Sequence, residues 1–187
     1  LRGEHYGGSD AHDWTTNSGR YYLREISVPD GYLIEQSVIP VEFTYENQFI
    51  AWQVVDCLHS DKQTTVEIDK RAFTSDSDDT FALPGATLTV TDWNGNVVDS
   101  WESSDTAHVI CGLHLSHDFA GNRDTSKVYT LAETCPADGY TTARSIQFRL
   151  EQATDDNAYL QETAVWVLHE SEDTAYQSGS IISPTAF

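Results

Sequence analysis

The sequence contains an internal repeat of domain size. The stretch "YYLREISVPDGY" at residues 21–32 returns in altered form as "YTLAETCPADGY" at residues 129–140. The two copies align without a gap and are identical at six positions, namely Tyr21/Tyr129, Leu23/Leu131, Glu25/Glu133, Asp30/Asp138, Gly31/Gly139 and Tyr32/Tyr140. Solenoid repeats have periods of roughly 20 to 50 residues. The two copies start at residues 21 and 129, and this spacing is longer than a solenoid period. The repeat therefore predicts tandem small domains.

Length and charge narrow the classes of protein that the chain can belong to. The chain has 187 residues, enough for one or two domains, and the repeat favours two. Its net charge is −20, from 30 acidic and 10 basic residues. Nucleic acid and an anionic membrane surface would repel such a chain. This charge suits a soluble extracellular protein. No apolar run approaches the roughly 20 residues that span a bilayer.

The residue pattern indicates β-structure throughout. Short alternating runs rich in β-branched and aromatic residues lie at 64–70, 86–93, 96–101, 127–133, 145–151 and 162–170. The Asn-Gly pair in "WNGN" (93–96) is typical of a tight hairpin, and "LPGA" (83–86) and "PADGY" (136–140) indicate further turns. We expect an all-β fold, an antiparallel Greek-key β-sandwich.

The repeat also suggests domain boundaries. A counterpart of the 64–70 strand in the first copy would fall before residue 1, so we expect an excerpt from a longer protein. Residues 1–60 would be the later part of a first module plus a linker. Residues 61–172 would be a complete second module, and 173–187 a linker or tail.

Two ionisable side chains are expected to point into the core of the second module. Alternation places Lys70 on the face of Val66 and Ile68, and it places Glu133 on the face of Tyr129 and Leu131. One alternative is that such residues lie at strand ends and reach water. The recurrence of the glutamate as Glu25 in the first copy favours a paired, buried arrangement.

The last strand of each copy carries an acidic residue that is also expected to point into the core. Trp166, Leu168 and Glu170 share one face, and Asp56 follows Trp52 at the same spacing. A lysine amine held against a carboxyl group can form an amide when a glutamate transfers the proton. Such an intramolecular crosslink would be a single-turnover event, so we do not expect an enzyme.

Together these motifs resemble a known family. "VEIDKRAF", "LPGATLTVTDWNGNVVDSW" and "YTLAETCPADGY" are similar to the Cna protein B-type domain, the prealbumin-like module of Gram-positive adhesin stalks and sortase-assembled pilins. "YYLREISVPDGY" and the residues after it resemble the later half of a preceding module. The resemblance spans about residues 20–170.

The resemblance implies roles for the inward residues. Lys70 would be the amine donor of an isopeptide bond and Glu133 its promoter, while Glu25 and Asp56 would be promoter and acceptor in the first module. The acceptor position of the second module falls on Glu170, where the family has Asn or Asp. The competing outcome is a buried ion pair between Lys70 and Glu133 or Glu170.

The three cysteines leave several states open. Cys111 and Cys135 lie in one repeat unit and are the candidate disulfide pair, whereas Cys57 lies at the junction and is expected to be inert. Three free thiols are the alternative.

No cofactor and no metal site are expected. His108, His114 and His117 match no standard zinc spacing, and Asp76, Asp78 and Asp79 lack that of a calcium loop.

The expected function is a stalk or spacer module of a cell-wall-anchored surface adhesin or pilin-like protein. Its partners would be neighbouring modules of the same longer protein. One alternative is a carbohydrate-binding β-sandwich of a secreted enzyme, in which Trp14, Trp93 and Trp101 stack on sugar rings. The other is a module that itself binds a host matrix protein or glycan.

Overall fold

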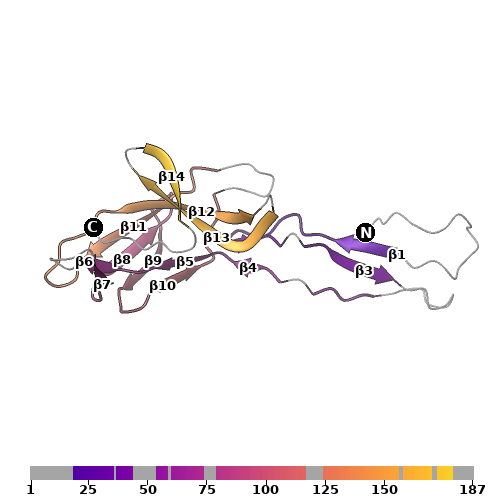
Figure 1. Cartoon of the computed structure of the whole chain (residues 1–187), viewed down its shortest axis with the longest axis horizontal. Helices are drawn as coiled ribbons and strands as arrows, with labels where there is room; N and C mark the ends of the chain where they lie inside the picture. Colours follow the sequence, from indigo (N-terminus) through magenta and orange to yellow (C-terminus); the bar gives the residue numbers. More distant parts are fainter. Residues whose placement is uncertain are drawn as a thin grey trace, which may run out of the picture. The chain divides into compact units, whose positions relative to one another are not determined.

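The computed structural model describes residues 19–35, 37–43, 54–58, 60–73, 79–116, 124–155, 158–169 and 172–178 (Figure 1). The strands are β1 (Gly19–Leu23), β2 (Tyr32–Leu33), β3 (Ile39–Phe43), β4 (Lys62–Gln63), β5 (Thr65–Ile68), β6 (Arg71–Phe73), β7 (Thr80–Ala82), β8 (Thr87–Thr91), β9 (Val97–Glu102), β10 (His108–Cys111), β11 (Tyr129–Cys135), β12 (Ile146–Asp155), β13 (Ala158–His169) and β14 (Glu172–Ser178). All strand pairs are antiparallel, as the sequence pattern predicts. The described residues include no helix that could cross a membrane.

The chain divides into two compact units. The first comprises Leu1–Ile26 and Glu35–Ser60, and the second comprises Ser27–Ile34 and Asp61–Phe187. In the first unit β1 pairs with β3, from Gly19 opposite Phe43 to Leu23 opposite Ile39. Apolar side chains of this unit, such as Ile26, Val54 and Leu58, are exposed.

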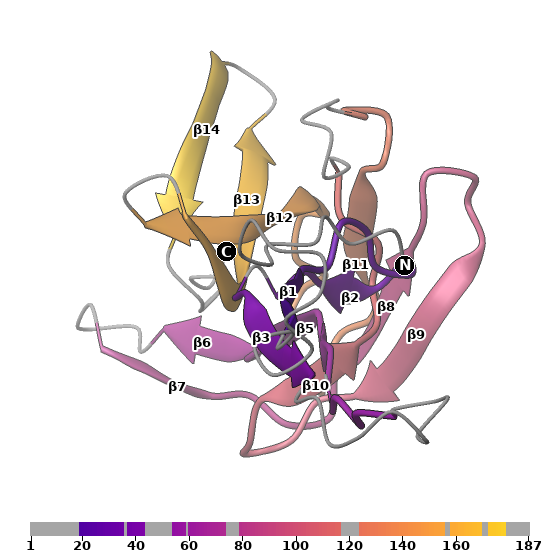
Figure 2. The ribbon, with the colours of Figure 1, turned by 90° about the vertical axis from the view of Figure 1, so that its right-hand side faces the viewer.

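The second unit has sandwich-like packing of antiparallel sheets. Its six-stranded sheet has the order β14-β13-β12-β11-β8-β9, with β14 at one border and the β8–β9 hairpin at the other (Figure 2). β5 pairs with β10, β6 with β7, and β2 with β4 in separate two-stranded sheets. Val66 and Ile68 of β5 pack in one buried cluster with Leu88 of β8, Leu131 of β11 and Phe148 of β12. The core therefore lies where β5 and β10 meet the six-stranded sheet.

Side-chain alternation explains which residues enter this core. β8 reads as alternating half-buried and buried positions, with Leu88 and Val90 buried. In β11 the buried set is Tyr129, Leu131 and Glu133, which is the face expected from the sequence. Burying an apolar side chain of this size contributes about 1.5 to 3 kcal/mol.

The core face of β13 differs from the expected one. Val165 is buried in the core and Val167 packs against it, whereas Trp166 and Leu168 alternate with them and are half-buried. The Arg149 guanidinium lies over the Trp166 ring, 5.9 Å from its centroid. The expectation that Trp166 and Leu168 face the core is therefore wrong. Every position from 164 to 168 is apolar, so alternation could not identify the inward set.

Two segments lie in elements other than those expected. Residues 172–178 form the border strand β14, most of which lies in the segment 173–187 that was expected to be a linker or tail. Residues 27–34 belong to the first repeat copy by sequence but pack in the second unit. A border strand exposes much of its surface, so it needs few apolar residues and leaves a weak sequence signal.

Candidate functional site

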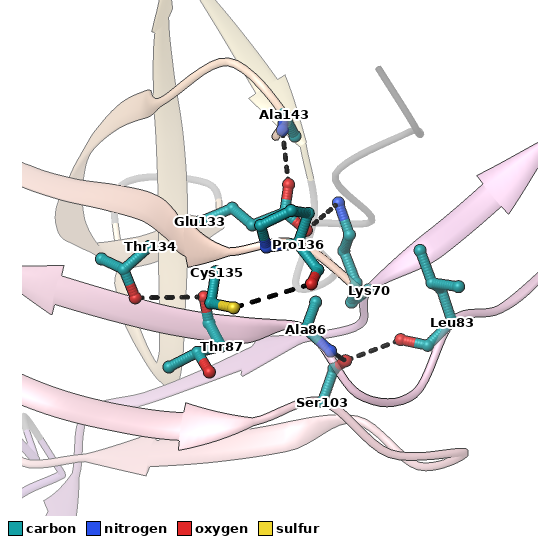
Figure 3. A network of polar contacts seen from close by, with 10 residues as sticks. All are labelled: Lys70, Leu83, Ala86, Thr87, Ser103, Glu133, Thr134, Cys135, Pro136 and Ala143. Carbon is teal, nitrogen blue, oxygen red and sulfur yellow. Dashed lines mark hydrogen bonds and ion pairs between the residues drawn. The ribbon is translucent and has the colours of Figure 1, made fainter. Parts of the chain in front are cut away.

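The candidate site centres on Lys70 and Glu133. Lys70 follows β5 and continues the inward face of Val66 and Ile68, while Glu133 ends the buried set of β11. Their side chains meet with Lys70 Nζ 3.3 Å from Glu133 Oε1 (Figure 3). The Lys70 side chain is 11% exposed and that of Glu133 is 1% exposed. The structure thus brings the two predicted residues together as a largely buried ion pair.

Backbone contacts hold both members of this pair. The second carboxylate oxygen of Glu133, Oε2, accepts a hydrogen bond from the Ala143 amide (Figure 3). On the other side, the Leu83 amide donates to the Lys70 carbonyl over 2.9 Å. Each carboxylate oxygen of Glu133 therefore has a polar contact, which offsets part of the cost of removing the charge from water.

The first repeat copy reproduces the geometry around its own glutamate. Glu25 Oε2 accepts from the Glu35 amide over 2.9 Å, and Glu35 occupies the repeat position of Ala143. The turns between them also match. Gly31 has φ +84° and Gly139 has φ +85°, and in both copies the following tyrosine amide donates to the carbonyl three residues before it.

A buried serine supports the turn beside the pair. Ser103 Oγ donates to the Leu83 carbonyl over 2.6 Å and accepts from the Ala86 amide over 2.9 Å (Figure 3). Its backbone accepts from the Gly85 amide and donates to the Ala86 carbonyl. The Leu83 amide donates to the Lys70 carbonyl, so the "LPGA" turn connects Ser103 to the backbone of Lys70. Sequence analysis missed Ser103 and Ala143, because a serine at a strand end and a backbone amide leave no recognisable pattern.

Of the two remaining predicted carboxyl residues, the structure describes one. Asp56 belongs to the first unit and is exposed. Glu170, the expected acceptor, lies outside the described residues, as does Trp52. Gln161 and Thr163 of β13 bond to Leu33 and Thr65, away from Lys70.

The expected pairing of Cys111 with Cys135 is not formed. All three cysteines are free and exposed. Cys111 lies opposite Thr65, at the start of β5, whereas Cys135 follows Glu133 beside Lys70. Five residues of extended chain separate Thr65 from Lys70, a distance of roughly 15 Å. A disulfide requires Cβ atoms about 4 Å apart, so this pairing prediction is wrong.

Two of the predicted histidines are held by aromatic and acidic neighbours. The His108 ring stacks on Trp101 with centroids 4.1 Å apart, and its Nε2 lies 2.8 Å from Asp99 Oδ2. His114 packs edge-on against Trp93, and its Nδ1 lies 3.3 Å from Asp30 Oδ2. In the described part of the chain, no three His, Cys, Asp or Glu side chains converge as metal ligands. His117, Asp76 and Asp78 lie outside the described residues, and Asp79 is exposed.

The tryptophans proposed for sugar stacking pack against protein. Trp93 and Trp101 are half-buried and pack on the core cluster. His108 covers one face of Trp101, and Lys127 Nζ lies 5.7 Å from the Trp93 centroid. Trp14 lies outside the described residues. The two described rings therefore do not form an open platform for a sugar.

Tyr129 connects the core to the His114 segment. Its hydroxyl accepts a hydrogen bond from the His114 amide over 2.9 Å, and its ring stacks on Phe148. Burial raises the pKa of the Tyr129 phenol above 10.0, and the nearby carboxylates of Asp92 and Asp30 add to this rise. The phenol therefore stays neutral at physiological pH and acts as a structural acceptor.

Comparison with known proteins gives a structural neighbour but no matching family. No protein-family model matches the chain, and no curated protein matches it. A solved structure titled "The Bacillus anthracis TIE protein" is similar, with a TM-score of 0.42 and 20% sequence identity. The match covers 79% of this chain and 25% of that chain, so this chain spans about a quarter of the neighbour's length.

Proposed function

We propose that this chain is a structural spacer from the stalk of a cell-surface protein. The two repeat copies would belong to tandem B-type modules with a Greek-key, prealbumin-like arrangement. The observation that carries the proposal is the repeated glutamate geometry. Glu133 and Glu25 each precede a turn of the same shape, and each accepts a hydrogen bond from the amide ten positions on. Repetition of one local architecture along a chain is typical of modular spacers.

The charge and the surface of the chain support the same proposal. A net charge of −20 keeps an extended extracellular protein soluble and discourages self-association. The described tryptophans pack on protein groups, which disfavours the sugar-binding alternative. We place the protein outside the cell, at the cell wall. Neighbouring modules of the longer protein would be its partners, and no enzymatic turnover is proposed.

We further propose that the Lys70–Glu133 ion pair takes the place of a covalent crosslink in the second module. The contact of 3.3 Å is that of an ion pair. The residues that follow β11 supply an amide for Glu133, so both carboxylate oxygens are engaged. In the crosslinking alternative, Lys70 Nζ would form an amide with the Glu170 carboxyl group, and the displaced hydroxyl would leave with a proton as one water.

Intact mass measurement separates these two outcomes. We expect the measured mass of the purified wild-type chain to equal the mass calculated from its sequence. The mass of the Lys70→Ala variant should likewise equal that calculated from the variant sequence. Lys127→Ala is the matched control, since Lys127 lies by Trp93 and away from Glu133. A wild-type mass lower by one water, with the deficit abolished by Lys70→Ala and kept in Lys127→Ala, would contradict the ion-pair proposal.

A binding screen tests the spacer function itself. A spacer should give no saturable binding to a glycan array or to immobilised matrix proteins. Saturable binding that survives at physiological salt would instead identify the chain as an adhesin module in its own right.

A further inference from the structure

Residues 27–34 belong to the first repeat copy by sequence and to the second unit by packing. By sequence they belong to the first repeat copy, in which Asp30–Ile34 correspond to Asp138–Thr142 of the second copy. By packing they belong to the second unit. We infer that residues 31–34 form a strap, a built-in element of the second unit that opens only when that unit unfolds. This inference goes beyond the spacer function and does not depend on it.

Two apolar side chains anchor the strap. Leu33 is fully buried and belongs to the core cluster with Val66 and Ile68, and Ile34 is 2% exposed. The strand β2 places Leu33 opposite Lys62 and Tyr32 opposite Gln63. Release of the strap would therefore expose both apolar side chains and open the core beside β5.

A buried glutamine holds the strap by its backbone. Gln152 of β12 is 3% exposed, and its side chain bonds to both backbone groups of Ile34. Its Oε1 accepts from the Ile34 amide over 3.0 Å, and its Nε2 donates to the Ile34 carbonyl over 2.9 Å. The same Nε2 donates to the Leu160 carbonyl over 2.7 Å. The side chain thus substitutes for a neighbouring strand, and removing the strap would leave the Gln152 amide group without its two partners on Ile34.

The turn before these residues fits tightly against the second unit. Gly31 has φ +84°, and a Cβ built on it would lie 2.4 Å from the Gly112 carbonyl oxygen. The Gly31 carbonyl accepts from the Thr64 amide over 2.9 Å. Thr64 is fully buried, and its Oγ1 donates to the Leu113 carbonyl over 2.6 Å. Only glycine fits here, because the atoms that a Cβ would meet belong to the backbone of Gly112 and cannot move aside as a flexible side chain could.

The second copy provides an internal control for this interpretation. Gly139 has the same conformation, with φ +85°, but a Cβ on it would meet nothing within 4 Å. Thr141 and Thr142 occupy the positions of Leu33 and Ile34 and are exposed. One turn shape therefore occurs twice, once docked through an apolar pair and once undocked with a polar pair.

Native-state hydrogen exchange of the full chain tests the strap directly. If the strap opens only with the whole second unit, the amides of Ile34 and Thr64 should exchange with the same opening free energy as that of Ala132, which lies opposite Thr89 in the six-stranded sheet. Exchange at Ile34 and Thr64 faster than at Ala132 by more than about a hundredfold would show local opening. That result would overturn the inference, and it requires no variant.

Substitutions that place the residues of one repeat copy in the other give an independent test. Leu33→Thr with Ile34→Thr should lower the thermal midpoint of the second unit by roughly 5 to 10 °C or more. The mirror variant, Thr141→Leu with Thr142→Ile, should leave that midpoint within about 2 °C of the wild type. Equal effects of the two double variants would contradict the strap.

The paired glycines separate docking from backbone strain. Gly31→Ala and Gly139→Ala introduce the same left-handed strain, but only the first also clashes with Gly112. We expect Gly31→Ala to lower the midpoint at least twice as far as Gly139→Ala. Matching decreases would show that residue 31 is under no contact constraint, and the inference would fail.

Discussion

At the scale of single residues, the candidate site is built around the ion pair of Lys70 and Glu133. A pair this buried gains strongly from mutual attraction but has lost most of its hydration. Its net contribution is therefore small compared with the cost of breaking it, because one member alone would be left charged in the core. The neighbouring ion pair of Arg71 and Asp69 is more exposed, with Arg71 Nη1 2.9 Å from Asp69 Oδ2. It serves as a comparison for the buried pair.

Lys70→Ala should lower the free energy of unfolding by about 3 to 5 kcal/mol, because it leaves the Glu133 carboxylate buried without its cation. Asp69→Asn, which breaks the more exposed pair, should cost less than about 1 kcal/mol. Urea unfolding followed by tryptophan fluorescence measures both values. The double variant Lys70→Met with Glu133→Leu should recover part of the loss. A Lys70→Ala cost as small as that of Asp69→Asn would mean that the pair is not buried in solution.

Tyr129 should make the stability of the second unit sensitive to alkali. Its pKa is raised by burial in the folded state, so above pH 10 the unfolded chain loses the phenolic proton first. The unfolded state then binds fewer protons than the folded state, and the free energy of unfolding falls as pH rises.

Tyr129→Phe should remove this alkaline contribution while costing about 1 kcal/mol at pH 7, because the His114 amide loses its acceptor. Urea titrations at pH 7, 9 and 10.5 compare the slopes of the two proteins. If the wild type and the variant lose stability in parallel above pH 10, Tyr129 titrates as an exposed tyrosine would.

At the scale of elements, the "LPGA" turn is held by contacts from outside its own sequence. Gly85 supplies the left-handed backbone conformation, with φ +89°. Ser103, at the end of β9, then satisfies the Leu83 carbonyl and the Ala86 amide. In the same turn the Leu83 amide donates to the Lys70 carbonyl, so Ser103 helps to hold the backbone from which the Lys70 side chain extends.

Ser103→Ala should destabilise the second unit by about 1 to 3 kcal/mol, because it leaves the Ala86 amide and the Leu83 carbonyl buried without the hydroxyl. Ser104→Ala is the matched control, since the Ser104 hydroxyl is exposed and bonds to the exposed Thr106. Its cost should stay within about 0.5 kcal/mol. Chemical unfolding of the two variants decides, and similar costs would exclude a structural role for the Ser103 hydroxyl.

At the scale of the whole molecule, the chain gains no stability from a disulfide in the described structure. Cys111 lies opposite the start of β5, whereas Cys135 follows the glutamate that contacts Lys70 beyond the end of β5. Cys57 belongs to the other unit. The exposure of all three thiols makes this arrangement measurable without unfolding the protein.

The folded chain should react with three equivalents of a thiol reagent such as dithionitrobenzoate, because each cysteine is exposed and unpaired. Denaturant should add none, and reductant should leave both the intact mass and the thermal midpoint unchanged. A count of one thiol before reduction and three after it would instead show that a disulfide forms in solution.

The sequence by itself determined the class of fold and the inward direction of two charged side chains. β-branched alternation with Gly-containing turns is a local property, so the strands around 64–70, 86–101 and 127–151 follow from it. The same alternation placed Lys70 and Glu133 toward the core before their contact was known. A uniformly apolar run such as 164–168 carries no such information, and there the inward face was decided only by packing.

Only the tertiary structure decided which residues serve the site and which unit each segment joins. The Ala143 amide and Ser103 act through positions that no local pattern encodes. Residues 31–34 read as the end of one repeat, yet Leu33 and Ile34 are buried in the second unit under the side chain of Gln152. Long-range contacts of this kind depend on how separate strands meet, and a repeat in the sequence fixes the shape of a turn without fixing what the turn docks against.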